Sequence, residues 1–277
     1  IINSFTMNKS IFFATLLFGL SLSSLAQNVN IPDANFKSYL VGNSAINTNM
    51  DAEIQVSEAN AFSGTIDVSS SSIADLTGIG AFTSLTVLYC GQNLLTSLDL
   101  SANVALTDLA VALNQISTLN LSSNVALVNV YCQSAQITSL DVRGCTALAN
   151  LQCNGNQLTS LDLSTNTALA DLGCYSNSLT ALDLSANTAL TKLLAQNNDL
   201  SELNVQNGNN LNMAGGPGDF NIQNNPNLTC VQVDDVAYSN STWGWKDAGA
   251  SFSTDCNACL VNIPDANFKA ALVANST

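Results

Sequence analysis

The sequence predicts a solenoid in which short parallel β-strands stack, coil upon coil, around one apolar core. A pattern of 21 residues recurs six times between residues 85 and 203, and a fixed period of this length is typical of repeat architectures. Within each repeat, apolar residues recur at alternate positions, as they do on strands with one buried face. No repeat can bury its leucines alone, so each coil has to pack against its neighbours. Leucine opens all six repeats, at Leu85, Leu106, Leu127, Leu148, Leu169 and Leu190.

Each 21-residue unit contains one phrase twice, which predicts two short strands and two turns per coil. Residues 85–93 read L-x-x-L-x-C-x-x-N, and residues 95–103 read L-x-x-L-x-L-x-x-N. The spacing of parallel strands places neighbouring coils about 4.8 Å apart. The asparagine that closes each phrase is expected to turn inward and satisfy backbone groups at the corner. The third coil breaks the pattern at Ala135 and Cys145, which predicts a local irregularity there.

Four cysteines occupy an inward strand position of the repeats. Other repeats hold valine or alanine at the equivalent position, so these thiols are expected to act as buried apolar filler. Cys132, Cys153 and Cys174 fall on neighbouring coils, so distance alone leaves a bridge between them open, whereas Cys90 is two coils from Cys132 and cannot reach it. The four residues are Cys90, Cys132, Cys153 and Cys174.

One repeat shows the complete pattern and carries a family resemblance. Residues 148–163 read L-x-x-L-x-C-x-x-N-x-L-x-x-L-D-L, which resembles the leucine-rich repeat superfamily in its nested 21-residue bacterial class. Residues 31–37 (IPDANFK) resemble the opening of secreted or surface leucine-rich repeat proteins from Bacteroidetes-type bacteria. The resemblance implies an α/β-type solenoid, mostly of parallel β-strands. It further implies binding or adhesion outside the cell, and it carries over no catalytic residue.

Segments of different character flank the repeats. From Met7 a basic start leads into the apolar run of residues 11–22, which predicts a secretory signal and export to the cell surface or beyond. Residues 261–276 match residues 29–44 at 13 of 16 positions, so a second cap is expected to begin there. The predicted segments are an upstream stretch with the signal (1–26), a helical N-terminal cap (27–84), the repeats (85–210), a C-terminal cap (211–256), and a linker with the truncated start of a second cap-plus-repeat domain (257–277).

The composition excludes several classes of function. The chain of 277 residues has six lysines and arginines against 20 acidic residues, a net charge of −14. A basic surface for nucleic acid is therefore absent, and DNA and RNA are excluded as partners. Histidine is absent, which removes the usual catalytic base and the commonest metal ligand. We expect a non-enzymatic protein without a resident cofactor and with no transmembrane segment in the mature chain.

Within the N-terminal cap, residues 47–58 resemble an EF-hand calcium loop. Oxygen-bearing side chains stand at loop positions one, three, five, seven and twelve. The first is an asparagine rather than an aspartate, and Ala52 occupies position six, where glycine normally makes the sharp turn. A polar turn between two helices explains the same residues without an ion. The candidate calcium ligands are Asn47, Asn49, Asp51, Glu53 and Glu58.

The C-terminal cap is expected to carry a disulfide. In an oxidising compartment a bridge between Cys230 and Cys256 would close this cap. Trp243 and Trp245 fall in the same segment and are expected to fold over the open end of the solenoid, because aromatic side chains bury large areas.

One strand face varies between coils and is the candidate binding surface. Positions that repeat identically are held by the fold, whereas the outward positions of the L-x-x-L-x-C strands mix tyrosine, amides and charges. Such a mixture suits a protein or a carbohydrate ligand, and a merely solvated sheet face is the alternative. The candidate ligand-binding residues are Tyr89, Asp108, Asn129, Tyr131, Gln133, Asn150, Gln152, Asn154, Asp171, Tyr175 and Lys192.

The opposite face is uniform and acidic. Its equivalent positions hold Asp99, Asn120, Asp141, Asp162, Asp183 and Asn204, and like charges one coil apart repel each other unless something offsets them. Turn hydrogen bonds, neighbouring hydroxyls or a stripe of bound cations would do so, and the structural role is favoured. A protein built wholly as a spacer between other surface domains is the alternative to a binding module.

Overall fold

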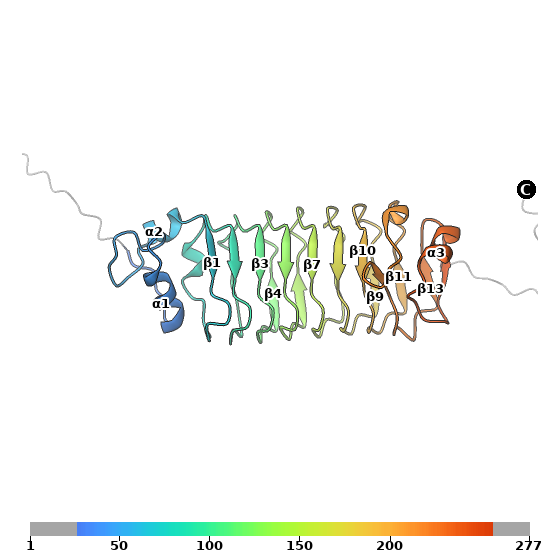
Figure 1. Ribbon diagram of the computed structural model, residues 1–277, viewed down its shortest axis with the longest axis horizontal. Helices are drawn as coiled ribbons and strands as arrows, with labels where there is room; N and C mark the ends of the chain where they lie inside the picture. Colours follow the sequence, from blue (N-terminus) through green and yellow to red (C-terminus); the bar gives the residue numbers. More distant parts are fainter. Residues whose placement is uncertain (1–26, 257–277) are drawn as a thin grey trace, which may run out of the picture.

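The computed structural model describes residues 27–256 and confirms the predicted solenoid. Figure 1 shows an elongated rod in which the strands lie across the long axis, with two helices at one end and a third at the other. The predicted signal (1–26) and second cap (257–277) lie outside the described residues. Among the described helices, none is long and apolar enough to cross a membrane.

The strands of the first phrase of each coil build an eight-stranded parallel sheet. Its strands pair 21 residues apart through the repeats, so that Leu88, Leu109 and Val130 stand in one row. The sheet extends beyond the repeats at both ends in the same register. Its members are β1 (Thr65–Asp67), β2 (Val87–Tyr89), β3 (Asp108–Ala110), β5 (Asn129–Tyr131), β7 (Asn150–Gln152), β8 (Asp171–Gly173), β10 (Lys192–Leu194) and β12 (Phe220–Asn221).

The strand of the second phrase forms in some coils only. Residues 97–99 and 160–162, where a second strand was predicted, adopt no regular strand. Residues 160–162 follow the third coil, and one corner of the third coil lies very close to the second coil. A Cβ on Gly144 of that corner would lie 1.7 Å from the carbonyl oxygen of Ser122. The strands that do form are β4 (Thr118–Asn120) with β6 (Ser139–Asp141), and β9 (Ala181–Asp183), β11 (Glu202–Asn204), β13 (Cys230–Gln232) and β14 (Ser251–Ser253).

The apolar rows predicted to face inward form one continuous core. Every leucine that opens a repeat is fully buried, and so are the cysteines of the inward strand position. These cysteines are free thiols, which confirms their role as apolar filler. Burial raises the pKa of Cys90 to about 12, and that of Cys153 to about 12. The thiols are therefore neutral at physiological pH and unreactive as nucleophiles.

The asparagine that closes the first phrase of a coil forms hydrogen bonds with the preceding coil. Asn114 donates its Nδ2 to the carbonyl oxygens of Cys90 and Val111 and accepts the N–H of Leu95 at its Oδ1. Its side chain is buried, so these bonds satisfy backbone groups that bend out of the sheet. The residue before the asparagine takes a left-handed conformation in successive coils, including Leu113 at φ 58°.

The third coil is irregular, as predicted. The inward positions of two ladders hold Ala135 and Cys145 in place of asparagine, and both are fully buried. The thiol of Cys145 donates to the carbonyl oxygen of Leu121, the group that an asparagine amide would reach in the regular coil. Ser134 and Gln136, on either side of Ala135, both adopt positive φ. The thiol of Cys145 thus replaces one asparagine amide as a hydrogen-bond donor. At Ala135, where the other amide is missing, the backbone on both sides adopts a left-handed conformation.

Two helices and a 3-10 turn cover the N-terminal end. In α1 (Ala34–Gly42) Phe36 and Leu40 are fully buried against the first coil. Asp33 caps this helix: its Oδ1 accepts the N–H of Asn35 and of Phe36. Its Oδ2 accepts from Ala74 and Asp75 and so ties the helix to the chain entering the repeats. The other elements of this cap are α2 (Val56–Ala61) and η1 (Ile79–Ala81).

The C-terminal end is closed by aromatic side chains and by the predicted disulfide. Trp243 is buried and stacks on Phe220, with ring centroids 4.3 Å apart. Its indole donates to the carbonyl oxygen of Met213. Cys230 and Cys256 are bonded, which confirms that pairing. The remaining elements here are η2 (Asn210–Asn212) and α3 (Val236–Thr242).

Candidate functional site

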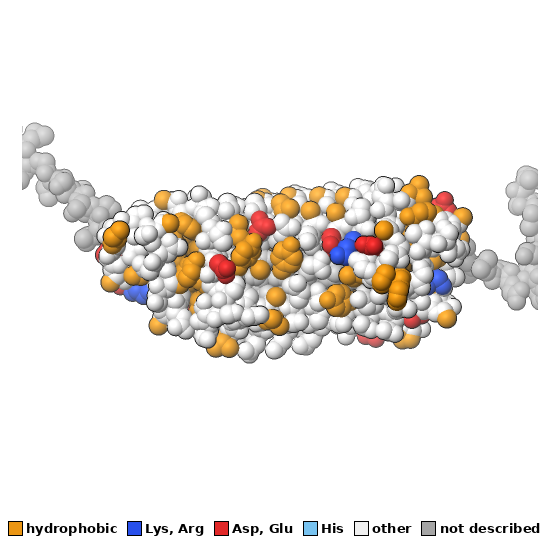
Figure 2. Space-filling model, viewed as in Figure 1, with side chains coloured by type: hydrophobic (Ala, Val, Ile, Leu, Met, Phe, Trp, Pro, Cys, Tyr) orange, Lys and Arg blue, Asp and Glu red, His pale blue; other side chains and the backbone are white. Residues whose placement is uncertain are grey.

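The outward residues of the eight-stranded sheet form one surface, here named the variable face. The register of the sheet brings eight of the predicted ligand-binding residues onto it, from Tyr89 on β2 to Lys192 on β10. The other three, Gln133, Asn154 and Tyr175, each follow the end of a strand by two residues. Figure 2 shows a face with few charges, where acidic and basic groups gather towards the C-terminal end and apolar groups are scattered between polar ones.

At its first coils the variable face holds a short hydrogen-bonded group around Asp108. One carboxylate oxygen of Asp108 accepts from the hydroxyl of Thr107 at 2.7 Å, and the other accepts from the amide of Asn129 at 2.7 Å. The side chain of Asp108 therefore has one orientation before any partner arrives.

A longer chain of hydrogen bonds crosses the centre of the face. The amide of Asn150 donates to the hydroxyl of Tyr131 at 3.3 Å, and Gln152 donates to both Asn150 and Asp171 at 2.9 Å. Lys192 completes the chain with an ion pair to Asp171 at 3.2 Å. Five side chains on four strands thus fix one another, and this half of the face is preorganised for recognition.

Gly173 makes this arrangement possible. It occupies the outward position of β8, where other coils carry a side chain, and a Cβ there would lie 2.0 Å from the Oε1 of Gln152. The amide of Gln152 lies in the space that the missing side chain leaves.

Several side chains on the face keep unused hydrogen-bonding capacity. Among the described residues, the Oε1 atoms of Gln133 and Gln196 are buried without a hydrogen-bond partner. Tyr89, Asn154 and Tyr175 make no side-chain hydrogen bond within the part of the chain that the structure describes. Buried acceptors without partners cost free energy.

The structure adds Trp245 to this surface, which sequence reasoning had assigned to the cover of the open end. The carbonyl oxygen of Trp245 accepts the N–H of Ile222, just as that of Ala110 accepts from Cys90 in the regular coils. Trp245 therefore extends the row of Tyr89 and Tyr131 by one further coil, and it is 39% exposed. The signal was hidden because irregular loops break the 21-residue period after residue 208.

The opposite, acidic face is held by turn hydrogen bonds. Each repeated aspartate accepts the backbone N–H of the residue two positions on, as Asp99 does from Ser101 and Asp183 from Ser185. The hydrogen bond from Ser101 lowers the pKa of the Asp99 carboxyl group, and the side-chain bond from Ser164 lowers that of Asp162. Hydrogen bonds to the charged form thus offset the repulsion between neighbouring coils.

Asp141 on the same face has an additional partner. The guanidinium group of Arg143 contacts both of its carboxylate oxygens, at 3.0 and 2.8 Å, and lowers the pKa of Asp141. Arg143 is largely exposed, so this pair contributes little to stability.

The loop of residues 47–58 is closed by its own hydrogen bonds. The Oε1 atom of Glu58 accepts the backbone N–H groups of Thr48 and Asn49, and its Oε2 accepts that of Gln55. Burial raises the pKa of Glu58, but these hydrogen bonds outweigh it and hold the pKa below its ordinary value. An ion would have to compete with these donors for the carboxylate.

Two further features separate this loop from an EF-hand. The left-handed residue is Met50 at φ 59°, two positions before Ala52, where the EF-hand turn would fall. Glu53 pairs with Lys37 at 2.7 Å, while the Oδ1 of Asn47 is buried without a partner. Within residues 27–256, no group of three or more His, Cys, Asp or Glu side chains could hold a metal ion.

Solved structures with the same architecture come from Listeria monocytogenes. Internalin C2 (InlC2) of strain 4b F2365 is 20% identical, with a TM-score of 0.57, and the match covers 78% of this chain and 93% of that one. An internalin (InlF) of the same strain is 19% identical, with a TM-score of 0.53 and coverage of 82% and 80%. These likenesses show the same parallel β-solenoid fold.

A third match is the functional domain of InlJ from Listeria monocytogenes, which is described as including a cysteine ladder. It is 27% identical with a TM-score of 0.44, and the match covers 76% of this chain. The chain spans 58% of the length of that domain. No protein-family model and no curated protein matches this sequence.

Proposed function

We propose that this chain is a non-enzymatic, secreted or cell-surface module that binds a protein partner through the variable face. The observation that carries the proposal is the set of varied side chains on a rigid sheet, many of them already held in place by hydrogen bonds. Preorganised groups lose little conformational entropy when a partner arrives, which favours affinity. We also assign the chain to the nested 21-residue class of bacterial leucine-rich repeats, of Bacteroidetes type.

The chemistry of the face supports a protein partner first. Tyr89, Tyr131 and Trp245 offer rigid aromatic area, and such residues dominate the binding energy of protein interfaces. The amide of Asn154 is partly exposed and makes no side-chain hydrogen bond within the described residues, so it can pair with a partner. A carbohydrate is the second candidate, because aromatic rings beside unused amide acceptors can also stack on and hydrogen-bond a sugar.

The test compares capture of partners by face variants. Tyr89→Ala combined with Tyr175→Ala removes two rings that make no side-chain hydrogen bond, so the network of the face is left intact. Ser97→Ala with Ser160→Ala on the opposite face is the matched control. Cross-linking on intact target cells followed by mass spectrometry tests for a protein partner, and binding to a glycan array tests for a carbohydrate. In whichever assay the wild-type chain binds, the face variant should lose binding and the control should retain it. Equal capture by both variants would refute the face assignment, and no capture by the wild-type chain would favour a spacer.

A further inference from the structure

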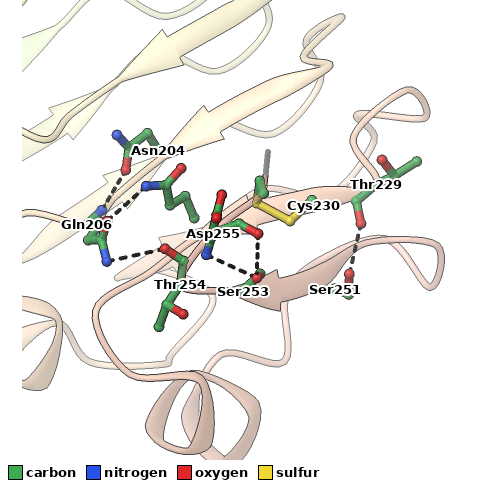
Figure 3. Close-up of a disulfide and its surroundings, with 10 residues drawn as sticks. Asn204, Gln206, Thr229, Cys230, Ser251, Ser253, Thr254 and Asp255 are labelled. Carbon is green, nitrogen blue, oxygen red and sulfur yellow. Dashed lines mark hydrogen bonds between the residues drawn. A yellow bond between two sulfur atoms is a disulfide. The ribbon is translucent and has the colours of Figure 1, made fainter. Parts of the chain in front are cut away.

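A groove lies on the second sheet at the C-terminal end, on the face opposite the variable face. It encloses about 400 Å³ over β9, β11 and β13. Figure 3 shows the disulfide, with Cys230 on its strand and the amide side chains of Asn204 and Gln206 nearby. We name it the disulfide groove; its lining residues used below are Ala181, Asp183, Ser201, Glu202, Asn204 and Gln232.

The walls of the disulfide groove are fixed. The Cys230–Cys256 bond ties β13 to the chain that leaves β14. On the same side, the amide of Gln232 donates to Gln206 at 2.8 Å, and the backbone N–H of Gln206 donates to Asn204 at 3.0 Å (Figure 3). The shape is therefore present before a ligand binds.

Two carboxylates of the groove lack a cationic partner. Asp183 uses one oxygen to accept the N–H of Ser185, and its other oxygen has no hydrogen bond within the described residues. The carboxylate of Glu202 has none within the same residues. Asp183 and Glu202 stand on neighbouring strands, two positions apart along the strand, because Glu202 pairs with Ala181. The spacings between and along strands separate their Cβ atoms by roughly 8 Å.

Within the described residues, each lysine and arginine side chain already has a partner. Lys37, Arg143 and Lys192 are each held by an acidic side chain, at 2.7, 2.8 and 3.2 Å. Lys246 donates to the carbonyl oxygen of Ala250 and lies over the ring of Phe252. No cationic side chain of the described residues is therefore left to pair with the two exposed carboxylates of the groove.

We propose that the disulfide groove binds an extended basic segment of a partner protein, in which lysines alternate with small residues. Alternate side chains of an extended peptide lie about 7 Å apart on one side, close to the separation of the two carboxylates. Ala181 and Ser201 leave room for its backbone. This site is separate from the proposed function, since it lies on the other sheet and uses none of the variable face.

The test measures binding of a fluorescein-labelled heptapeptide of alternating serine and lysine to the full chain by fluorescence anisotropy. At about 0.15 M salt, where charges beyond about 8 Å are screened, local rather than overall charge decides the result. Asp183→Asn with Glu202→Gln should weaken binding at least about tenfold, the effect of roughly 1.4 kcal/mol. Asparagine already occupies the Asp183 position in other coils, at Asn120 and Asn204, so the fold tolerates it.

The matched control removes the same charge from another hollow. Asp75 and Asp99 line a hollow of about 280 Å³ at the other end of the rod, and each caps its own turn as Asp183 does. Asp75→Asn with Asp99→Asn should change the affinity less than about twofold. Equal weakening by both pairs would show that the peptide follows net charge alone and would overturn the proposal. An absence of saturable binding to the wild-type chain would overturn it too.

Discussion

Replacing Leu113 by asparagine should stabilise the protein. Leu113 occupies the left-handed position before the ladder asparagine, at φ 58°, with half of its side chain exposed. The equivalent residues of other coils include Gly155 and Asn197, at φ 68° and 57°. Leucine is poorly suited to this conformation, because its Cβ approaches the following carbonyl oxygen.

The magnitude follows from the backbone strain and from the exposed side chain. The left-handed region costs an L-residue roughly 1–2 kcal/mol, and asparagine tolerates it better than leucine does. The exposed half of Leu113 contributes little burial, so the net gain in the free energy of unfolding is about 1 kcal/mol. For a protein of this size that gain raises Tm by about 2–4 °C. The reverse change, Asn197→Leu, should cost about as much, and it also removes a hydrogen bond of 2.7 Å from Asn224.

Thermal and urea unfolding followed by circular dichroism measure the effect. Leu94→Asn is the matched control, since Leu94 is a leucine of the adjacent coil at the same corner, 51% exposed, and lacks a positive φ. The control should change the stability by less than about 0.5 kcal/mol. If Leu113→Asn fails to exceed Leu94→Asn, or lowers Tm, the strain argument is wrong.

Three further predictions concern the two caps. Replacing both Cys230 and Cys256 by serine should lower the free energy of unfolding by about 3.5 kcal/mol, from the loop entropy of a bond spanning 26 residues, and urea titration checks this. Asp33→Ala should cost about 1–2 kcal/mol. Because hydrogen bonds outweigh burial and lower the folded pKa of Asp33, the wild type should lose this stability as pH falls below its ordinary value of 3.8, while the variant should not; pH-dependent melting decides. If the loop of residues 47–58 binds calcium, calorimetry at millimolar calcium should show heat that Glu58→Gln abolishes, and a wild type without heat ends the calcium hypothesis.

The sequence predicted the repeats well because their spacing is constant. A period of 21 residues places Leu88 beside Leu109 and Tyr89 beside Ala110, so the register and both faces follow from counting. The disulfide could be predicted as well, since Cys230 and Cys256 bracket the segment that closes the open end.

Other features lay outside what the residues could indicate. The position of Trp245 depends on two loops that break the period, so no spacing marked it as part of the variable face. The left-handed corners carry Gln92, Leu113 and Ser134 where glycine or asparagine would have signalled them, because the stacking of coils overrides local preference. The second strand was predicted for every coil, yet residues 97–99 and 160–162 lack it although they carry the same apolar pattern as β4, β6 and β9, so the pattern alone does not decide where this strand forms.

The asparagine ladder points in one direction, and this bears on how the chain is made. Asn114 and Asn198 each bond to the coil before them, at Cys90 and at Cys174. A coil that leaves the ribosome therefore completes the corner of the coil before it, while its own corner is completed by the asparagine of the next coil, as the N–H of Leu95 is by Asn114. The N-terminal cap supplies the first template, and the chain can add one finished layer for every 21 residues translated, with only its newest edge unprotected.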